Sequence, residues 1–433
     1  MNALSKKLHG QLHYAWIVAA VVFLVLLVAA GVRATPGVLM VPLERAFGWS
    51  RSTISAAVAL NLALYGLLGP FAGAAMQRFG IKRTVLCALV LLSSAVALST
   101  AMRSPWQLLL TWGLMIGVGS GITAAVLAAT VVNRWFRERR GVVMGALTAS
   151  TATGQLVFLP LLAAIVESDG WRTAAWVVAV AVAMLIPLCA WLLFDVPDDL
   201  GLRPYGATAE SESSTTQRSP PKVQRTGNPV AMAWNVLKRA ARVRDFWILF
   251  GTFFICGLST NGLIGTHFIS FCIDGGVPEV RAAGVLAMMG IFDLVGTTLS
   301  GWLSDRYDSR WLLFWYYGLR GLSLLYLPYS DFSFWGLGLF GMFYGLDWIA
   351  TVPPTVRITN DIFGERDASV VFGWIFTGHQ LGAAVAAFGA GTIHALFGAY
   401  TGAFLIAGTM CGVAAMAVLG ARRTPSLRPA PAA

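Results

Sequence analysis

The sequence predicts an all-α membrane protein in which twelve transmembrane helices form two pseudo-symmetric six-helix bundles. Of its 433 residues, 57% are apolar and only 12% are charged, whereas a soluble domain carries roughly a quarter charged residues. The apolar residues lie in continuous runs of about 20 residues, the length at which a helix crosses a bilayer. A membrane barrel would show short stretches of alternating polarity instead. This composition excludes an ordinary soluble enzyme.

The predicted spans lie between charged or Pro- and Gly-rich breaks, six before and six after one long polar segment. Their approximate ranges are 14–44, 52–77, 84–102, 105–133, 141–166, 171–194, 245–273, 279–304, 310–330, 332–357, 368–396 and 398–420. The polar segment contains a Pro-, Ser- and Thr-rich stretch with too few apolar residues to pack a core. It ends in a short amphipathic helix with Trp234 and Leu237 on one face and Lys238 beside them, typical of a helix on an anionic lipid surface. We therefore predict an N-terminal bundle at 1–200, a linker with an interfacial helix at 201–243 and a C-terminal bundle at 244–433.

The basic residues are distributed unequally between the two predicted sides of the membrane. With alternating spans, 24 Lys and Arg residues lie on the side of the termini and linker, and five lie on the other side. By the positive-inside rule, we expect both termini and the linker to be cytoplasmic in a bacterial inner membrane. The net charge of +11 therefore reports topology, because nucleic-acid binding would require these residues on one soluble face.

The two halves resemble each other at a constant offset of 228 residues. The segment 73–83 maps onto 301–311, and the segment 141–145 maps onto 369–373. A repeated offset at two places indicates duplicated six-helix halves with a central cavity between them.

The sequence resembles the major facilitator superfamily over essentially its whole length. The signature of that family between helices two and three is a glycine followed by Asp-Arg and a basic cluster. The matching residues are Gly73, Arg78, Gly80, Lys82 and Arg83. Gln77 stands where the family has the acid, whereas the second-half copy keeps the acid and the base as Asp305 and Arg306. The resemblance implies the major facilitator fold, with these loops acting as gates.

A finer resemblance lies in FGWSRSTIS at 47–55, which is similar to the monocarboxylate and oxalate/formate branch. It implies a secondary transporter that moves a small organic anion, such as a monocarboxylate, together with a proton. That branch places an acid at Asp293, which we therefore expect to be the coupling acid. Porters of the branch carry an arginine one turn later, where this chain has Thr297, so the cation that pairs with the anion must come from elsewhere. The alternative function is proton-driven efflux of drugs or other amphipathic metabolites.

Four titratable groups of the second half lie at one depth in the membrane. At about 1.5 Å per residue, they are about 15 to 17 Å from the cytoplasmic surface. They are Asp293, Arg320, Asp347 and His379. We expect Asp293 and Asp347 to carry the proton, to pair with Arg320, or to do both, and these alternatives stay open. Charged groups inside a span face a cavity or a partner, since exposure to lipid is costly.

Arg33 is a buried cation in the first span, without an acid within a turn or two of its own helix. We predict that it binds the negative group of the substrate, although its long side chain can also reach outward to the interface. The predicted substrate-binding residues are Arg33, Tyr65, Asn261, Tyr344, His379 and Gln380. For most of them, packing is the alternative role.

The chain carries no visible catalytic or metal-binding pattern. We expect no metal, since no second His, Cys or acid stands at ligand spacing from His379. We also expect no cofactor and no enzymatic activity. An ATP-binding loop is missing from the sequence, so a gradient must drive transport. The expected partners are a small organic molecule, the proton and the lipid bilayer, and we expect a monomer without nucleic acid.

Overall fold

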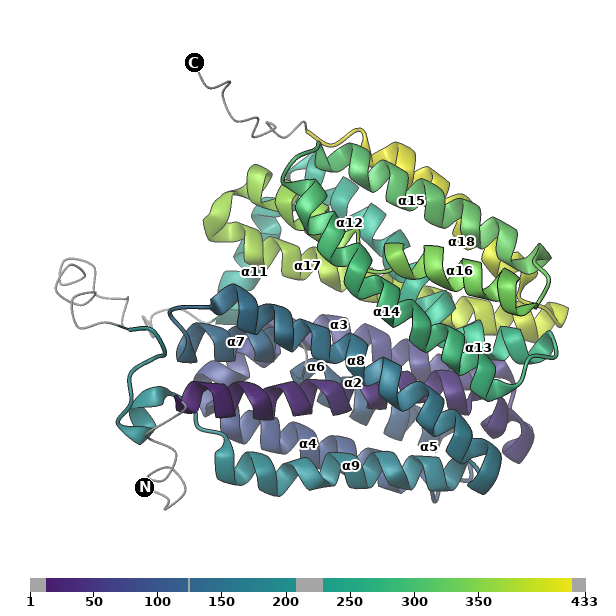
Figure 1. The fold of residues 1–433 in the computed structure, drawn as a ribbon, viewed down its shortest axis with the longest axis horizontal. Helices are drawn as coiled ribbons and strands as arrows, with labels where there is room; N and C mark the ends of the chain where they lie inside the picture. Colours follow the sequence, from purple (N-terminus) through teal and green to yellow (C-terminus); the bar gives the residue numbers. More distant parts are fainter. Residues whose placement is uncertain (1–12, 124, 208–228, 423–433) are drawn as a thin grey trace.

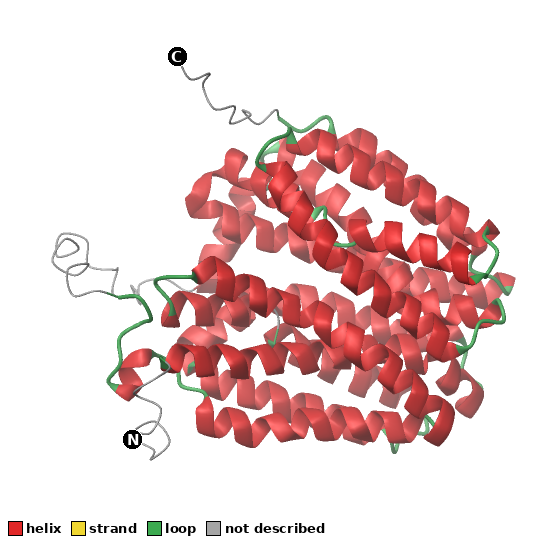
Figure 2. Cartoon of the chain, viewed as in Figure 1, coloured by secondary structure: helices red, strands yellow, loops and turns green. Residues whose placement is uncertain are grey.

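The computed structural model describes residues 13–123, 125–207 and 229–422. The secondary-structure elements of these residues are all helices (Figures 1 and 2). Two groups of helices lie side by side, one purple to teal and the other teal-green to yellow (Figure 1). They correspond to the two predicted bundles. The predicted basic residues Lys6, Lys7, Arg423 and Arg428 lie outside the described residues, as does the part of the predicted linker at 208–228.

The first half begins with α2, which spans Tyr14–Phe47 and is buried along most of its length. The other elements are α3 (Arg51–Phe79), α4 (Ile81–Ser99), α5 (Pro105–Leu108), η1 (Leu109–Met115), α6 (Ile116–Ile122), α7 (Ala125–Trp135), α8 (Arg140–Asp169), α9 (Trp171–Leu192) and η2 (Pro197–Leu200). The fourth predicted span therefore consists of four short pieces, because a π-helical stretch interrupts it at η1 and α6 ends at Ile122, before α7 begins.

The second half follows a short helix, α11 (Pro229–Ala240). Its elements are α12 (Arg244–Gly257), η3 (Leu258–Ile264), α13 (Gly265–Asp274), α14 (Glu279–Ser304), α15 (Ser309–Tyr326), η4 (Leu327–Tyr329), α16 (Phe334–Asp347), α17 (Val352–Phe397) and α18 (Thr401–Val418). Gly364 has a φ of 72° and kinks α17, so this element contains the end of the tenth predicted span and all of the eleventh. Within the described residues, ten helical segments are long and apolar enough to cross a membrane. The ninth and tenth predicted spans fall on α15 and α16, which complete the second bundle.

The predicted internal repeat is visible in the helix packing. Gly117 of α6 lies against the backbone of Asn61 in α3, and Gly345 of α16 lies against the backbone of Met289 in α14. Both glycines and both of their partners are related by the offset of 228. A side chain at either glycine would collide with the neighbouring helix, so the same close approach of two helices recurs in each half.

Three helix pairs form the interface between the halves: α3 with α17, α8 with α14, and α2 with α13. We call one end of the bundle the linker end, since it carries residues 195–207 and α11, and we call the opposite end the far end. At the linker end, α11 buries Val236 and Ala240 and contacts both α17 and α3. Trp234 of the predicted apolar face is half exposed and meets Trp374 of α17 edge to face at 6.3 Å, and Leu237 packs against the core.

Candidate functional site

Arg33 occupies an unusual position in the central helix of the first half. It is partly exposed, whereas Gly31, Val32, Ala34 and Thr35 around it are all buried. The guanidinium carbon lies 5.0 Å from the centre of the Tyr65 ring. In the described part of the chain, no carboxylate forms an ion pair with Arg33. Arg33 thus keeps some accessible surface, and its guanidinium has no ion-pair partner among the described residues.

Residues of α17 face Tyr65 across the interface between the halves. The Tyr65 and Phe376 rings meet edge to face at 6.2 Å. The Thr377 hydroxyl donates to the Gly66 carbonyl at 3.2 Å, and the Gln380 side chain packs into the space that Gly66 leaves. The structure therefore brings Arg33 and Tyr65 of one half close to the part of α17 that carries Gln380, although no sequence spacing links them.

His379 lies behind this contact, in an aromatic setting. Its ring stacks on Phe376 at 5.6 Å and meets Phe253 at 4.9 Å. The side chains of His379 and Gln380 are both more than nine-tenths buried. Nδ1 of His379 and Oε1 of Gln380 are buried without a hydrogen-bond partner among the described residues. Such orphaned polar atoms are uncommon in protein interiors, so each one calls for an explanation, such as a functional role or a bound water.

Arg320 pairs with Asp347, which is one of the roles that the sequence left open for this acid. Nε donates to Oδ2 of Asp347 at 2.6 Å, and Nη1 donates to Sγ of Cys256 at 2.9 Å. Nη2 donates to the main-chain carbonyls of Asp347 and Trp348. The Arg320 side chain has no exposed surface, and these partners all belong to the second half.

The tenth span is broken where these groups meet, because α16 ends at Asp347 and α17 begins at Val352. Oδ1 of Asp293 accepts the main-chain N–H of Ile349 at 2.9 Å and the hydroxyl of Thr297 at 2.9 Å. The Ser300 hydroxyl donates to the carbonyl of Ala350. A helix break inside a membrane is tolerated only when its backbone groups find other partners. Here α14 and α15 supply them, a role that sequence reasoning missed for Ser300.

Two predicted substrate residues lie elsewhere in the second half. Tyr344 is 1% exposed, and its hydroxyl donates to the carbonyl of Ser259 at 2.8 Å. Asn261 lies in the π-helical stretch η3, where its carbonyl accepts the hydroxyl of Thr266. Neither makes a described contact with the Arg33 and Tyr65 pair, and Tyr344 already has its hydrogen-bond partner.

A cluster of charged groups joins the two halves at the far end. Arg51 at the start of α3 forms a two-pronged pair with Asp274 at the end of α13, with distances of 2.6 and 2.7 Å. Its Nε also bonds Glu44 at 2.9 Å, and His394 contacts Asp274 at 3.0 Å. Burial raises the pKa of Tyr400 to about 12, so its hydroxyl stays protonated beside Arg51. Sequence reasoning used Arg51 to count charges and as part of the motif at 47–55, and it missed this far-end cluster.

The predicted gating loops lie at the linker end. Arg306 stacks over Trp302 at 3.9 Å, Arg78 lies over Phe79 at 5.3 Å, and Asp305 pairs with Arg357 at 3.3 Å. Gly73 lies in α3, and Gly80 makes the turn into α4 with a φ of 89°. The main-chain N–H of Lys82 donates to Asp195 at 2.8 Å. Asp195, from the end of the sixth span, therefore caps α4 in the half where Gln77 replaces the family's acid.

Comparison with known proteins agrees with this architecture. The model of the Major Facilitator Superfamily matches residues 22–351 and 276–433. An uncharacterized MFS-type transporter, YcxA, of Bacillus subtilis (strain 168) is 25% identical over 86% of this chain and 85% of that protein. Monocarboxylate transporter 13 of Rattus norvegicus is 24% identical over 91% of this chain and 86% of that protein.

Solved structures confirm the fold. A bacterial homologue of the human lysosomal transporter Spinster has a TM-score of 0.71 at 15% identity, covering 96% of this chain and 100% of that one. The xylose transporter XylE of E. coli has a TM-score of 0.70 at 14% identity, covering 95% and 98%. The chain belongs to the Major Facilitator Superfamily. It is a multi-pass membrane transporter and not an enzyme.

Proposed function

We propose that this protein is a proton-coupled secondary transporter that moves a small organic anion, a monocarboxylate, across the bacterial inner membrane by alternating access. The observation that carries this proposal is the partly exposed guanidinium of Arg33 inside the bundle, without an ion-pair partner among the described residues. A relative named monocarboxylate transporter 13 supports the same class of substrate.

Arg33 suits a carboxylate both in chemistry and in position. A guanidinium binds a carboxylate through two parallel hydrogen bonds, and the rings of Tyr65 and Phe376 supply an apolar wall beside it. Arg33 lies 14 residues before the end of α2 at Phe47, which is about 21 Å along the helix axis. Arg33 also lies 19 residues after the start of this 34-residue helix, so it is near the middle of the span, which argues against an interfacial role.

Asp293 is the proposed coupling acid, and its contacts suggest how it acts. As a carboxylate it accepts the N–H of Ile349 at the break of the tenth span. Protonation weakens it as an acceptor, so binding of a proton and the geometry of the broken helix are linked. Asp347 is the less suitable carrier, because its charge is paired with Arg320 at 2.6 Å.

The far-end cluster fits one state of an alternating-access cycle. Arg51 and Glu44 belong to the first half, whereas Asp274 and His394 belong to the second. In the proposed cycle these contacts hold the far end closed, and they must separate before the Arg33 site opens to that side.

Counterflow of labelled monocarboxylates into proteoliposomes tests the proposal. Arg33→Ala should abolish binding and counterflow, and Arg33→Lys should weaken affinity because lysine keeps the charge but loses the two-pronged geometry. Arg281→Ala is the matched control, since Arg281 is exposed at the start of α14. Unchanged monocarboxylate affinity in Arg33→Ala would remove Arg33 from the site. Counterflow of lipophilic cations in place of carboxylates would favour the efflux alternative.

A further inference from the structure

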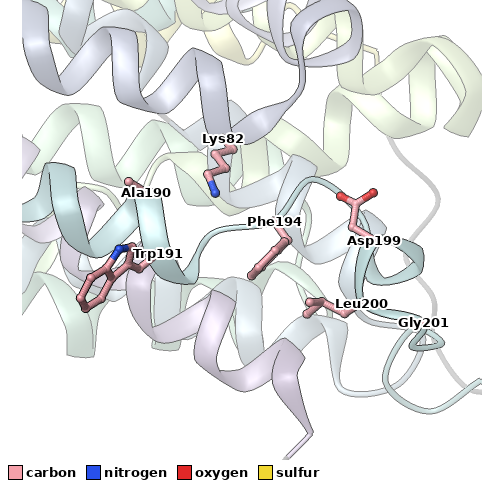
Figure 3. Close-up of a pocket in the computed structure, with 7 residues that line it drawn as sticks. All are labelled: Lys82, Ala190, Trp191, Phe194, Asp199, Leu200 and Gly201. Carbon is pink, nitrogen blue, oxygen red and sulfur yellow. The ribbon is translucent and has the colours of Figure 1, made fainter. Parts of the chain in front are cut away.

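A cavity of about 490 Å³ lies at the linker end of the first half, between the start of α4 and the end of α9. Its lining residues are Lys82, Ala190, Trp191, Phe194, Asp199, Leu200 and Gly201 (Figure 3). Lys82 belongs to the family signature between the second and third spans, but none of these residues belongs to the proposed Arg33 site, so this cavity requires an explanation of its own.

The position of the cavity places it at the membrane surface. Lys82 is the second residue of the membrane-spanning helix Ile81–Ser99, and Trp191 is the penultimate residue of Trp171–Leu192. Trp191 is 75% exposed, so its indole faces the surroundings of the bundle. Tryptophan at the end of a span lies at the level of the lipid headgroups. The cavity therefore opens where headgroups and the first carbons of acyl chains are found.

The cavity carries one cation and one anion. Nζ of Lys82 lies 5.2 Å from the centre of the Phe194 ring, and within the described residues it has no ion-pair partner. Asp199 is exposed, and one of its oxygens accepts the N–H of Val196 at 3.3 Å. In Figure 3 the ammonium group and the carboxylate lie on opposite sides of the Phe194 ring.

We propose that this cavity binds the headgroup of phosphatidylethanolamine. Lys82 pairs with the phosphate, and Asp199 accepts a hydrogen bond from the primary ammonium. Trp191 and Phe194 cover the glycerol and the first acyl carbons. Phosphatidylglycerol offers no cation to Asp199, and the trimethylammonium of phosphatidylcholine has no N–H to donate. The opposite charges of the site therefore favour a zwitterionic lipid with a primary amine.

Native mass spectrometry of the purified full chain tests the proposal, with dissociation constants measured for these three lipids. The wild type should prefer phosphatidylethanolamine. Lys82→Gln should weaken binding of all three lipids about tenfold, the loss expected for one charge-assisted hydrogen bond. Asp199→Asn should abolish the preference for phosphatidylethanolamine over phosphatidylcholine. Arg83→Gln is the matched control, because Arg83 is the exposed neighbour of Lys82 and does not line the cavity.

The proposal would be overturned if the wild type bound phosphatidylethanolamine and phosphatidylcholine with equal affinity. It would be overturned if Asp199→Asn still preferred phosphatidylethanolamine over phosphatidylcholine, or if Arg83→Gln weakened lipid binding as much as Lys82→Gln. Binding of soluble glycerophosphoethanolamine as tightly as the lipid would also overturn it, since the site would then recognise a free phosphate compound. Asp199→Asn hardly changes the size of an exposed side chain, so this variant should fold. The lipid preference can therefore be measured on it even if the Lys82 variant fails to fold.

Discussion

The ion pair between Arg320 and Asp347 predicts a large and non-additive effect on stability. The Arg320 side chain is 0% exposed and that of Asp347 is 11% exposed, with 2.6 Å between Nε and Oδ2. Removing one partner of such a pair leaves the other charge buried and costs about 3–5 kcal/mol. We therefore expect Arg320→Gln and Asp347→Asn each to lower the free energy of unfolding by about that amount.

The double variant should lose much less than the sum of the two single variants. It contains no uncompensated charge, but the carbonyls of Asp347 and Trp348 lose the donor that Arg320 provides. An unsatisfied buried carbonyl costs about 1–3 kcal/mol. We thus expect a total cost of about 2–6 kcal/mol for the double variant, against about 6–10 kcal/mol if the single effects added.

The free energy of unfolding can be measured by SDS titration of the purified variants in mixed micelles. The pair of Arg357 and Asp305 is the control, since the Asp305 side chain is 80% exposed and an exposed pair contributes about 1 kcal/mol or less. Additive effects of Arg320→Gln and Asp347→Asn would refute the structural pairing. Loss of proton-driven transport in a fully stable Asp347→Asn would instead assign the proton to Asp347.

The remaining predictions concern coupling, access and orientation. Asp293→Asn should abolish proton-driven accumulation but retain counterflow exchange, and loss of both at normal expression would contradict its role as coupling acid. Arg51→Gln should open the far end, measured as faster labelling of a Tyr65→Cys variant by a membrane-impermeant thiol reagent in right-side-out vesicles. An unchanged rate, or the same acceleration by the exposed Arg103→Gln, would contradict a closing role for the cluster. Protease should cleave the linker at 218–225 only from the inner side, because 24 basic residues lie on the predicted cytoplasmic side and five on the other. Cleavage in right-side-out vesicles would contradict this orientation.

The sequence alone determined the helical spans and the division into halves. Each apolar run must be helical to satisfy its own backbone inside lipid, so element type follows from composition with little influence from packing. The internal repeat was also readable, and the matched contacts of Gly117 and Gly345 confirm it. The common depth of Asp293, Arg320 and Asp347 followed from counting residues along each span.

The tertiary structure decided which of these groups meet. Arg320 pairs with Asp347, whereas Asp293 accepts an N–H at the helix break, and equal depth could not distinguish the two carboxylates. Arg51 and Asp274 are 223 residues apart in the chain, and Tyr65 meets Phe376 across the two halves. Depth along a helix is a local property, but the direction in which a side chain points depends on the rotation of that helix against its neighbours. That rotation is set by the packing of all the helices together.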